Sequence, residues 1–280
     1  EKERMTTGIF VLALAACLSA TMIGAWLIAI LTGRSGWIDA IWSFATGAFG
    51  AAAAMIPLAN SQISMRQMLV AILALFWSLR LGLHISIRTA RGGDDPRYKQ
   101  LREEWGGSFK RRLFWFLQIQ ALAAFALALS IMLAAHNPAP GLGVADWTGF
   151  AVLIVAIVGE TIADRQLSAF RSNPANKGKV CDVGLWGISR HPNYFFEWLG
   201  WLAYAIVAID LTGAYPWGWL AIAGPLLMYW LLVHASGIPP LEAHMLRSRG
   251  KAFRDYQRRV NPFWPGPQHA VDTSNHGDSR

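Results

Sequence analysis

The stretch GIFVLALAACLSATMIGAWLIAIL runs from Gly8 to Leu31 without a charged side chain. A transmembrane helix needs about 20 mostly apolar residues, and this run is long enough. It is also longer than the apolar core of a signal peptide. The LAAC segment that ends at Cys17 is therefore interpreted as part of a membrane span and not as a lipoprotein cleavage site. The stretch predicts a helix that crosses a membrane.

The whole chain has the composition of a membrane protein. Of its 280 residues, 54% are hydrophobic and only 15% are charged, whereas soluble domains have about 25% charged residues. The mean hydropathy is +0.32. A soluble globule this apolar would lack a polar surface, so the composition excludes that class. The two cysteines, Cys17 and Cys181, are too few for a disulfide framework and indicate no redox compartment.

Seven apolar segments of spanning length predict an all-α bundle of seven transmembrane helices. These segments are Gly8–Leu31, Trp37–Leu58, Met68–Ile87, Leu113–Ala135, Val144–Leu167, Tyr194–Thr212 and Trp217–Ala235. We expect the bundle to occupy residues 8–235, after an N-terminal tail (1–7) and before an amphipathic tail or lid (236–267) and a disordered tail (268–280).

The basic residues are concentrated in alternate loops. Most of the 25 Lys and Arg residues follow the first, third, fifth or seventh predicted span, whereas Arg66 stands alone between the second and third. Because cytoplasmic loops carry the excess of Lys and Arg, we expect the N-terminus outside and the C-terminus in the cytoplasm, in a bacterial inner membrane. Attraction to anionic membrane lipids explains part of this charge, and no nucleic-acid partner is expected.

Ionisable side chains inside the predicted spans indicate functional positions, because charge within a membrane is costly. Arg80 and His84 are four residues apart and share one face of the third span, as Glu160 and Asp164 do in the fifth. Glu197 lies about one turn into the sixth span. We expect these groups to converge on the cytoplasmic third of the bundle.

The densest polar stretch is DVGLWGISRHPNYFFE, over Asp182–Glu197. Pro192 suits the first turn of a helix, which places Arg190, His191 and Asn193 beside the free N–H groups of the helix start. A helix start with an arginine favours anion binding. The histidines lack the spacing of a zinc site, so no metal is expected. There is no glycine-rich phosphate loop, so a bound nucleotide would be held by discrete side chains within the bundle.

The C-terminal segment predicts an amphipathic helix, Leu241–Arg259, that follows the Pro239-Pro240 pair and is rich in Arg and Lys. One interpretation places this helix on the anionic inner leaflet. The other makes it a lid over a ligand. The side chains of such a lid are Glu242, His244, Tyr256 and Arg259.

The stretch GLWGISRHPNYFFE, over Gly184–Glu197, resembles the signature of bacterial membrane proteins similar to the steroid 5-alpha-reductase family. The Asp255-Tyr256 pair with its following basic run, and Arg88-Thr89 followed by the PRY segment that ends at Tyr98, are similar too. The resemblance covers the last two thirds of the chain. Isoprenylcysteine methyltransferases share a related Arg-His-Pro element, so the motif identifies a superfamily better than a reaction.

The resemblance implies a seven-helix bundle that holds NADPH at its cytoplasmic side. Asn193 and Glu197 match an Asn and a Glu near the nicotinamide, and Asp164 and Arg171 match polar cofactor contacts. The full set of expected cofactor-binding residues is Arg97, Asp164, Arg171, Lys179, Arg190, His191, Asn193, Glu197, Glu242, His244, Tyr256 and Arg259.

The substrate half of the site departs from the family. The steroid enzymes hold a substrate carbonyl with a Glu in the second span and a Tyr in the third. The comparable second-span stretch here reads LANSQ, over Leu58–Gln62, and the third span has no Tyr near His84. As catalytic residues we therefore expect His84 or Tyr98, either of which would stabilise a developing enolate.

The predicted function is a membrane reductase that transfers hydride from NADPH to the conjugated C=C of a lipophilic enone, such as a 3-oxo-4-ene steroid. One alternative is an S-adenosylmethionine-dependent methyltransferase of the isoprenylcysteine carboxyl methyltransferase type, acting on a lipid or prenylated thiol. A lipid-binding or transport protein ranks third, because the polar residues crowd toward one side and no internal repeat is visible.

Overall fold

The computed structural model describes residues 2–57, 62–92 and 95–270, and all regular structure in these ranges is helical. The predicted all-α class is thus confirmed. Part of the Leu58–Gln62 stretch and most of the predicted disordered tail lie outside the described residues.

The helices are α1 (Lys2–Thr32), α2 (Trp37–Ala54), α3 (Met65–Gly92), α4 (Pro96–Trp105), η1 (Gly106–Ser108), α5 (Phe109–Ala135), α6 (Val144–Ser172), η2 (Pro174–Asn176), η3 (Gly184–Gly187), α7 (Pro192–Ala208), η4 (Pro216–Ile222), α8 (Ala223–Trp230), η5 (Leu231–Ala235), α9 (Ile238–Arg249) and α10 (Lys251–Arg259).

Several of these helices are long and apolar enough to cross a membrane. Within the described residues there are 5 such segments: Gly8–Thr32, Met65–Gly92, Arg97–Ala135, Val144–Ser172 and Pro216–Arg249. The chain therefore has the helices of a multi-pass membrane protein. The two other predicted spans coincide with α2 and α7, which are shorter at 18 and 17 residues. The count of seven spans and the orientation stay predictions.

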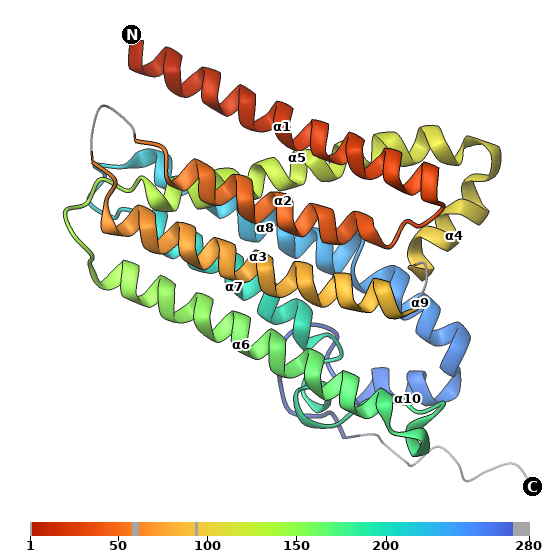
Figure 1. Ribbon diagram of the computed structural model, residues 1–280. Coiled ribbons are helices and arrows are strands. Elements are labelled where there is room, and N and C mark those ends of the chain that lie inside the picture. The colour runs from red at the N-terminus through yellow and green to blue at the C-terminus, as the bar shows by residue number, and fades with distance from the viewer. Residues whose placement is uncertain (1, 58–61, 93–94, 271–280) are drawn as a thin grey trace, which may run out of the picture. The chain divides into compact units, whose positions relative to one another are not determined.

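The chain divides into two compact units, which are described separately. Unit 1 contains residues 1–153 and 201–227, and unit 2 contains residues 154–200 and 228–280. In unit 1, α2 packs against α1, α3 and α5, and α1 also packs against α5 (Figure 1).

Small residues let α2 approach its neighbours closely. Ser43, Gly47, Gly50 and Ala54 are all buried along this helix. A Cβ atom on Gly47 would lie 2.0 Å from the Cβ of Ser78 on α3. Helices in a membrane gain little from the hydrophobic effect between them, so close packing of small residues is a main source of their association. The composition of α2 thus explains its central place in unit 1.

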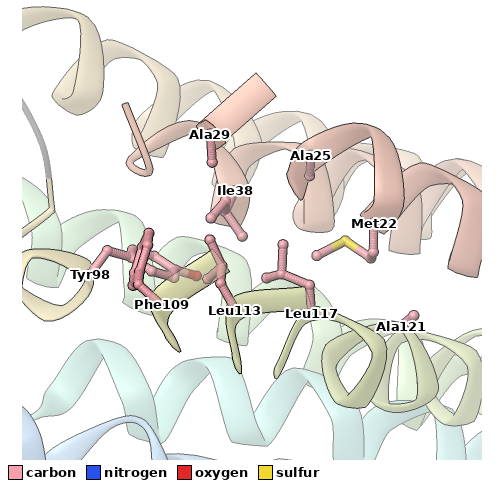
Figure 2. Packing of buried hydrophobic residues seen from close by; sticks show 9 residues of the cluster. All are labelled: Met22, Ala25, Ala29, Ile38, Tyr98, Phe109, Leu113, Leu117 and Ala121. Carbon is pink, nitrogen blue, oxygen red and sulfur yellow. The ribbon is translucent and has the colours of Figure 1, made fainter. Parts of the chain in front are cut away.

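A second cluster of buried side chains joins α1, α4 and α5, as Figure 2 shows. Met22 and Ala25 of α1 lie opposite Leu113 and Leu117 of α5, and Tyr98 of α4 closes the same cluster. Leu113 and Leu117 are completely buried. The short helix α4 is thereby fixed on the side of unit 1 by its one buried tyrosine.

Arg66 organises the opposite end of unit 1, at the start of α3. Its guanidinium donates to both carboxylate oxygens of Asp146, at 2.6 and 2.9 Å, and to the carbonyl oxygens of Asn137, Ala139 and Gly141. Both side chains of the ion pair are about 5% exposed. The basic residue that stands alone between two predicted spans is therefore a structural tie for the loop between α5 and α6.

We expect Gly47→Ala to destabilise unit 1, because the added methyl group would overlap Ser78 on α3. Overpacking of this kind costs about 1–3 kcal/mol. Gly24→Ala is the matched control, since nothing lies within 4 Å of a Cβ at that position of α1. The measurement is the thermal unfolding midpoint of both variants in detergent, and equal midpoints would contradict the close α2–α3 packing.

Arg66→Met should destabilise the protein by about 3–5 kcal/mol, because it leaves the buried carboxylate of Asp146 without its partner. The double variant Arg66→Met/Asp146→Leu removes both charges and should recover a large part of that loss. Denaturant unfolding of the single and double variants tests this, and a double variant no more stable than Arg66→Met would refute the ion-pair explanation.

Candidate functional site

The motif stretch of unit 2 begins with a tight turn that needs glycine. Gly184 has a φ of +59°, a left-handed conformation that disfavours other residues, and a Cβ on Gly187 would lie 2.9 Å from the carbonyl oxygen of Asp182. The indole of Trp186 donates to the Ala163 carbonyl of α6 at 2.9 Å. These contacts fix η3 against α6 and direct the following residues toward the start of α7.

Arg190 ties this loop to the C-terminal helices. Its Nε donates to Glu242 Oε1 at 2.7 Å and its Nη2 to Glu242 Oε2 at 3.3 Å. Its Nη1 donates to the carbonyl oxygens of Gln257 and Val260. Only 9% of the Arg190 side chain is exposed. Arg190 was predicted to contact an anion. In the structure its guanidinium donates hydrogen bonds to α9 and to the C-terminal end of α10.

The segment after α10 is bound to the same loop. The backbone N–H of Arg190 donates to the Asn261 carbonyl at 2.8 Å, and the Ser189 hydroxyl donates to the Phe263 carbonyl at 2.9 Å. The Phe263 ring is 2% exposed and packs edge-on against Tyr229 at 5.3 Å. The predicted amphipathic tail is thus part of the core of unit 2.

The apolar face of α10 is covered by protein. Phe253, Tyr256 and Val260 are buried together and pack against Val180 of the preceding loop. The Tyr256 hydroxyl donates to the carbonyl oxygen of Trp186 at 2.6 Å, and burial raises its pKa well above the usual range. Tyr256, predicted to contact a cofactor, is in this structure a hydrogen-bonded core residue.

Two buried acceptor atoms lie at the start of α7. His191 is 3% exposed, and its Nε2 lies 3.0 Å from Glu242 Oε1. The opposite ring nitrogen, Nδ1, and the side-chain oxygen of Asn193 are both buried and have no hydrogen-bond partner in the protein. Buried polar groups are normally satisfied, so these two atoms are candidate contacts for a bound molecule in unit 2.

The other expected residues of unit 2 lie on α6, on α7, in the loop between them and on the C-terminal helices. Glu197 is buried at 7% exposure on α7, and Asp164 is half-buried on α6. The exposed residues of the predicted set are Arg171, Lys179 and His244. Arg259 forms an ion pair with Asp182 at 3.0 Å. Gln257 donates to Glu242 at 2.7 Å but was not among the predicted residues. It stands among basic residues of a predicted amphipathic helix, and this pattern does not indicate a buried contact.

The remaining expected residues belong to unit 1. Arg97 forms ion pairs with Asp39 and Asp95. The Tyr98 hydroxyl donates to Asp39 Oδ1 at 3.0 Å, and the Tyr98 side chain is 2% exposed. His84 is half-buried on α3. In the structure, Arg97 and Tyr98 thus anchor α4 to the first turn of α2.

No metal site is found in the described part of the chain, since no group of three or more His, Cys, Asp or Glu side chains there is placed to hold an ion. Unit 2 offers neutral and charged polar groups for the recognition of a ligand. Acceptors at the start of α7 suit amide or amino groups of a ligand, and the basic residues of the loop after α6 suit its anionic groups.

The fold defines the class: an all-helical protein with the helices of a multi-pass membrane protein, in which the His191-Pro192 helix start is hydrogen-bonded to the C-terminal helices. A family model described as "Protein of unknown function (DUF1295)" matches residues 25–260. The chain therefore belongs to the DUF1295 family, which includes steroid 5-alpha-reductase-like proteins.

Two curated relatives are similar to the chain. Uncharacterized protein C594.04c of Schizosaccharomyces pombe is 25% identical over 271 residues, covering 86% of this chain and 75% of that protein. Probable O-methyltransferase ustE of Ustilaginoidea virens is 35% identical over 86 residues, covering 29% of this chain and 30% of that protein. The second similarity is therefore confined to less than a third of either chain.

We expect Arg190→Ala to release the C-terminal segment, because Glu242 then stays partly buried without its cation and two carbonyl oxygens lose their donor. Breaking such a pair costs about 3–5 kcal/mol. Limited trypsin digestion should cleave after Arg258 and Arg259 at least about tenfold faster than in the wild type. Arg254→Ala, at an exposed position of α10, is the control. Unchanged cleavage in Arg190→Ala would contradict the role of Arg190 in holding the C-terminal helices.

Proposed function

We propose that the chain is an integral membrane reductase that uses NADPH to reduce the conjugated C=C of a lipophilic enone, such as a 3-oxo-4-ene steroid. The observation that carries the proposal is the pair of buried acceptors, His191 Nδ1 and Asn193 Oδ1, at the start of α7. They lie in the motif that resembles the steroid 5-alpha-reductase family, and membership of DUF1295 supports the same superfamily.

The chemistry of unit 2 fits a pyridine dinucleotide. The two acceptors fit donor groups such as a carboxamide, while Arg171 and Lys179 are basic groups of the same unit that fit phosphates. Glu197 adds a buried carboxylate to α7, the helix that carries Asn193. NADPH, when bound, supplies the hydride for the double bond.

A proton must also reach the substrate, and the two expected donors are His84 and Tyr98. The Tyr98 hydroxyl proton is already engaged by Asp39 in a buried hydrogen bond. His84 is half-buried on α3, within an apolar helix long enough to span a membrane. We propose His84 or Tyr98 for the stabilisation of the developing enolate, a contribution of about 3 kcal/mol for one well-placed donor.

The alternative function is an S-adenosylmethionine-dependent membrane methyltransferase. It is favoured by one specific observation, the 35% identity to a probable O-methyltransferase over 86 residues. The amino groups of S-adenosylmethionine are also hydrogen-bond donors, so the acceptor pair fits this cofactor as well. The basic residues of unit 2 favour NADPH, because S-adenosylmethionine is itself cationic at sulfur and carries no phosphate.

Ligand-dependent thermal stability of the detergent-purified protein distinguishes these functions. We expect NADPH to raise the unfolding midpoint, because a ligand that binds only the folded state stabilises it. Arg171→Ala should weaken NADPH binding about tenfold through loss of a charged phosphate contact, whereas Lys251→Ala, an exposed basic residue at the start of α10, should not. Stabilisation by S-adenosylmethionine alone would replace the reductase with the methyltransferase.

A further inference from the structure

The His191 ring is held by two side chains of unit 2. Its Nε2 lies 3.0 Å from Glu242 Oε1, and its face stacks on Tyr194 with ring centres 5.4 Å apart and an interplanar angle of 11°. Glu242 is itself fixed, because Arg190 and Gln257 both donate to its carboxylate. The imidazole therefore has one orientation, set from α9.

The geometry also determines which nitrogen of His191 carries the proton. A carboxylate beside a guanidinium is ionised and only accepts hydrogen bonds, so the Nε2 that faces Glu242 must be the N–H donor. A neutral imidazole has one donor and one acceptor nitrogen, which makes Nδ1 an acceptor. Burial lowers the pKa of His191 although Glu242 opposes this, so the ring is neutral near pH 7.

Nδ1 and the Asn193 oxygen therefore present the same polarity. Both atoms are buried without a protein partner, and they belong to residues two positions apart at the start of α7. Leaving a buried acceptor unpaired is costly. A group that satisfies both atoms must supply N–H or O–H donors, and an ionised phosphate or carboxylate is repelled.

We propose that Glu242 is a positioning residue that keeps the His191 proton on Nε2, so that Nδ1 and Asn193 Oδ1 together accept hydrogen bonds from an amide or amino group of the bound nucleotide. This inference rests on the proposed function and deepens it. It replaces the expected direct contact between Glu242 and the cofactor with an action through His191. It also assigns the nucleotide's anionic groups to the basic residues of unit 2, such as Arg171 and Lys179, and not to the two acceptors.

The first test needs no variant of Glu242. The full-length protein is labelled with ¹⁵N-histidine, and the His191 signals are assigned by their loss in His191→Gln. We expect a protonated Nε2 and an unprotonated Nδ1 in the ligand-free protein, and an upfield shift of Nδ1 when NADPH is added, because Nδ1 then accepts a hydrogen bond. A proton on Nδ1 in the ligand-free protein, or an Nδ1 signal that stays in place although NADPH binds, would overturn the proposal.

The second test measures the Kd of NADPH for matched variants. Glu242→Gln offers His191 either an oxygen or an N–H group, so the tautomer is no longer fixed, and we expect Kd to rise about tenfold, as for the loss of one hydrogen bond. Glu242→Asp keeps a carboxylate and should retain the wild-type tautomer in the ¹⁵N spectrum. Asp255→Asn removes a 45%-exposed carboxylate from α10 and is the control for loss of charge.

The two proposals fail in different ways. If wild-type protein does not bind NADPH but shows an unprotonated Nδ1, the reductase function is wrong while the tautomer assignment holds. If Glu242→Gln folds, binds NADPH like Asp255→Asn and keeps the Nδ1 shift, Glu242 does not position His191 and this inference is wrong whatever the reaction is.

Discussion

The Arg190 guanidinium is the interaction on which the polar end of unit 2 depends. A charge removed from water is stable only when it is paired and hydrogen-bonded, and here the partners come from three parts of the chain: Glu242 of α9, the Gln257 carbonyl of α10 and the Val260 carbonyl beyond it. Satisfying one buried cation thus joins the motif loop to both C-terminal helices. The hydrogen bonds from Ser189 to Phe263 and from Tyr256 to Trp186 also connect the motif loop to the C-terminal segment.

This arrangement explains how a loop between two apolar helices can hold defined polar geometry. Backbone and side-chain polar groups need partners from protein where water is excluded. Glu242 accepts from Arg190, His191 and Gln257 at once, so its position and that of the imidazole are determined together. The unpaired Nδ1 of His191 therefore belongs to an imidazole in a fixed position and not to a loosely held side chain.

The helices of unit 1 are held together by a different kind of interaction. They associate through small residues, such as Gly47 against Ser78, and the two ends of unit 1 are tied by ion pairs. Arg66 and Asp146 lie at one end, and Arg97, Asp39 and Asp95 lie at the other. The pairing of Arg97 and Tyr98 with Asp39 gives these two residues a clear structural role, although the sequence had placed them among the candidates for cofactor contact and catalysis.

The sequence by itself determined the helical membrane class, because long uncharged apolar runs leave the backbone no other way to satisfy its hydrogen bonds. It also identified the Gly184–Glu197 motif, since Pro192 and the glycines impose local conformations. Only the tertiary structure decided what Arg190, Tyr256 and Glu242 do. A guanidinium, a phenol and a carboxylate can face a ligand or each other, and sequence spacing does not distinguish these cases. The choice depends on which distant residues fold against them, such as Gln257 and Phe263, because the free energy of a polar group is set by its partners and not by its position in the chain.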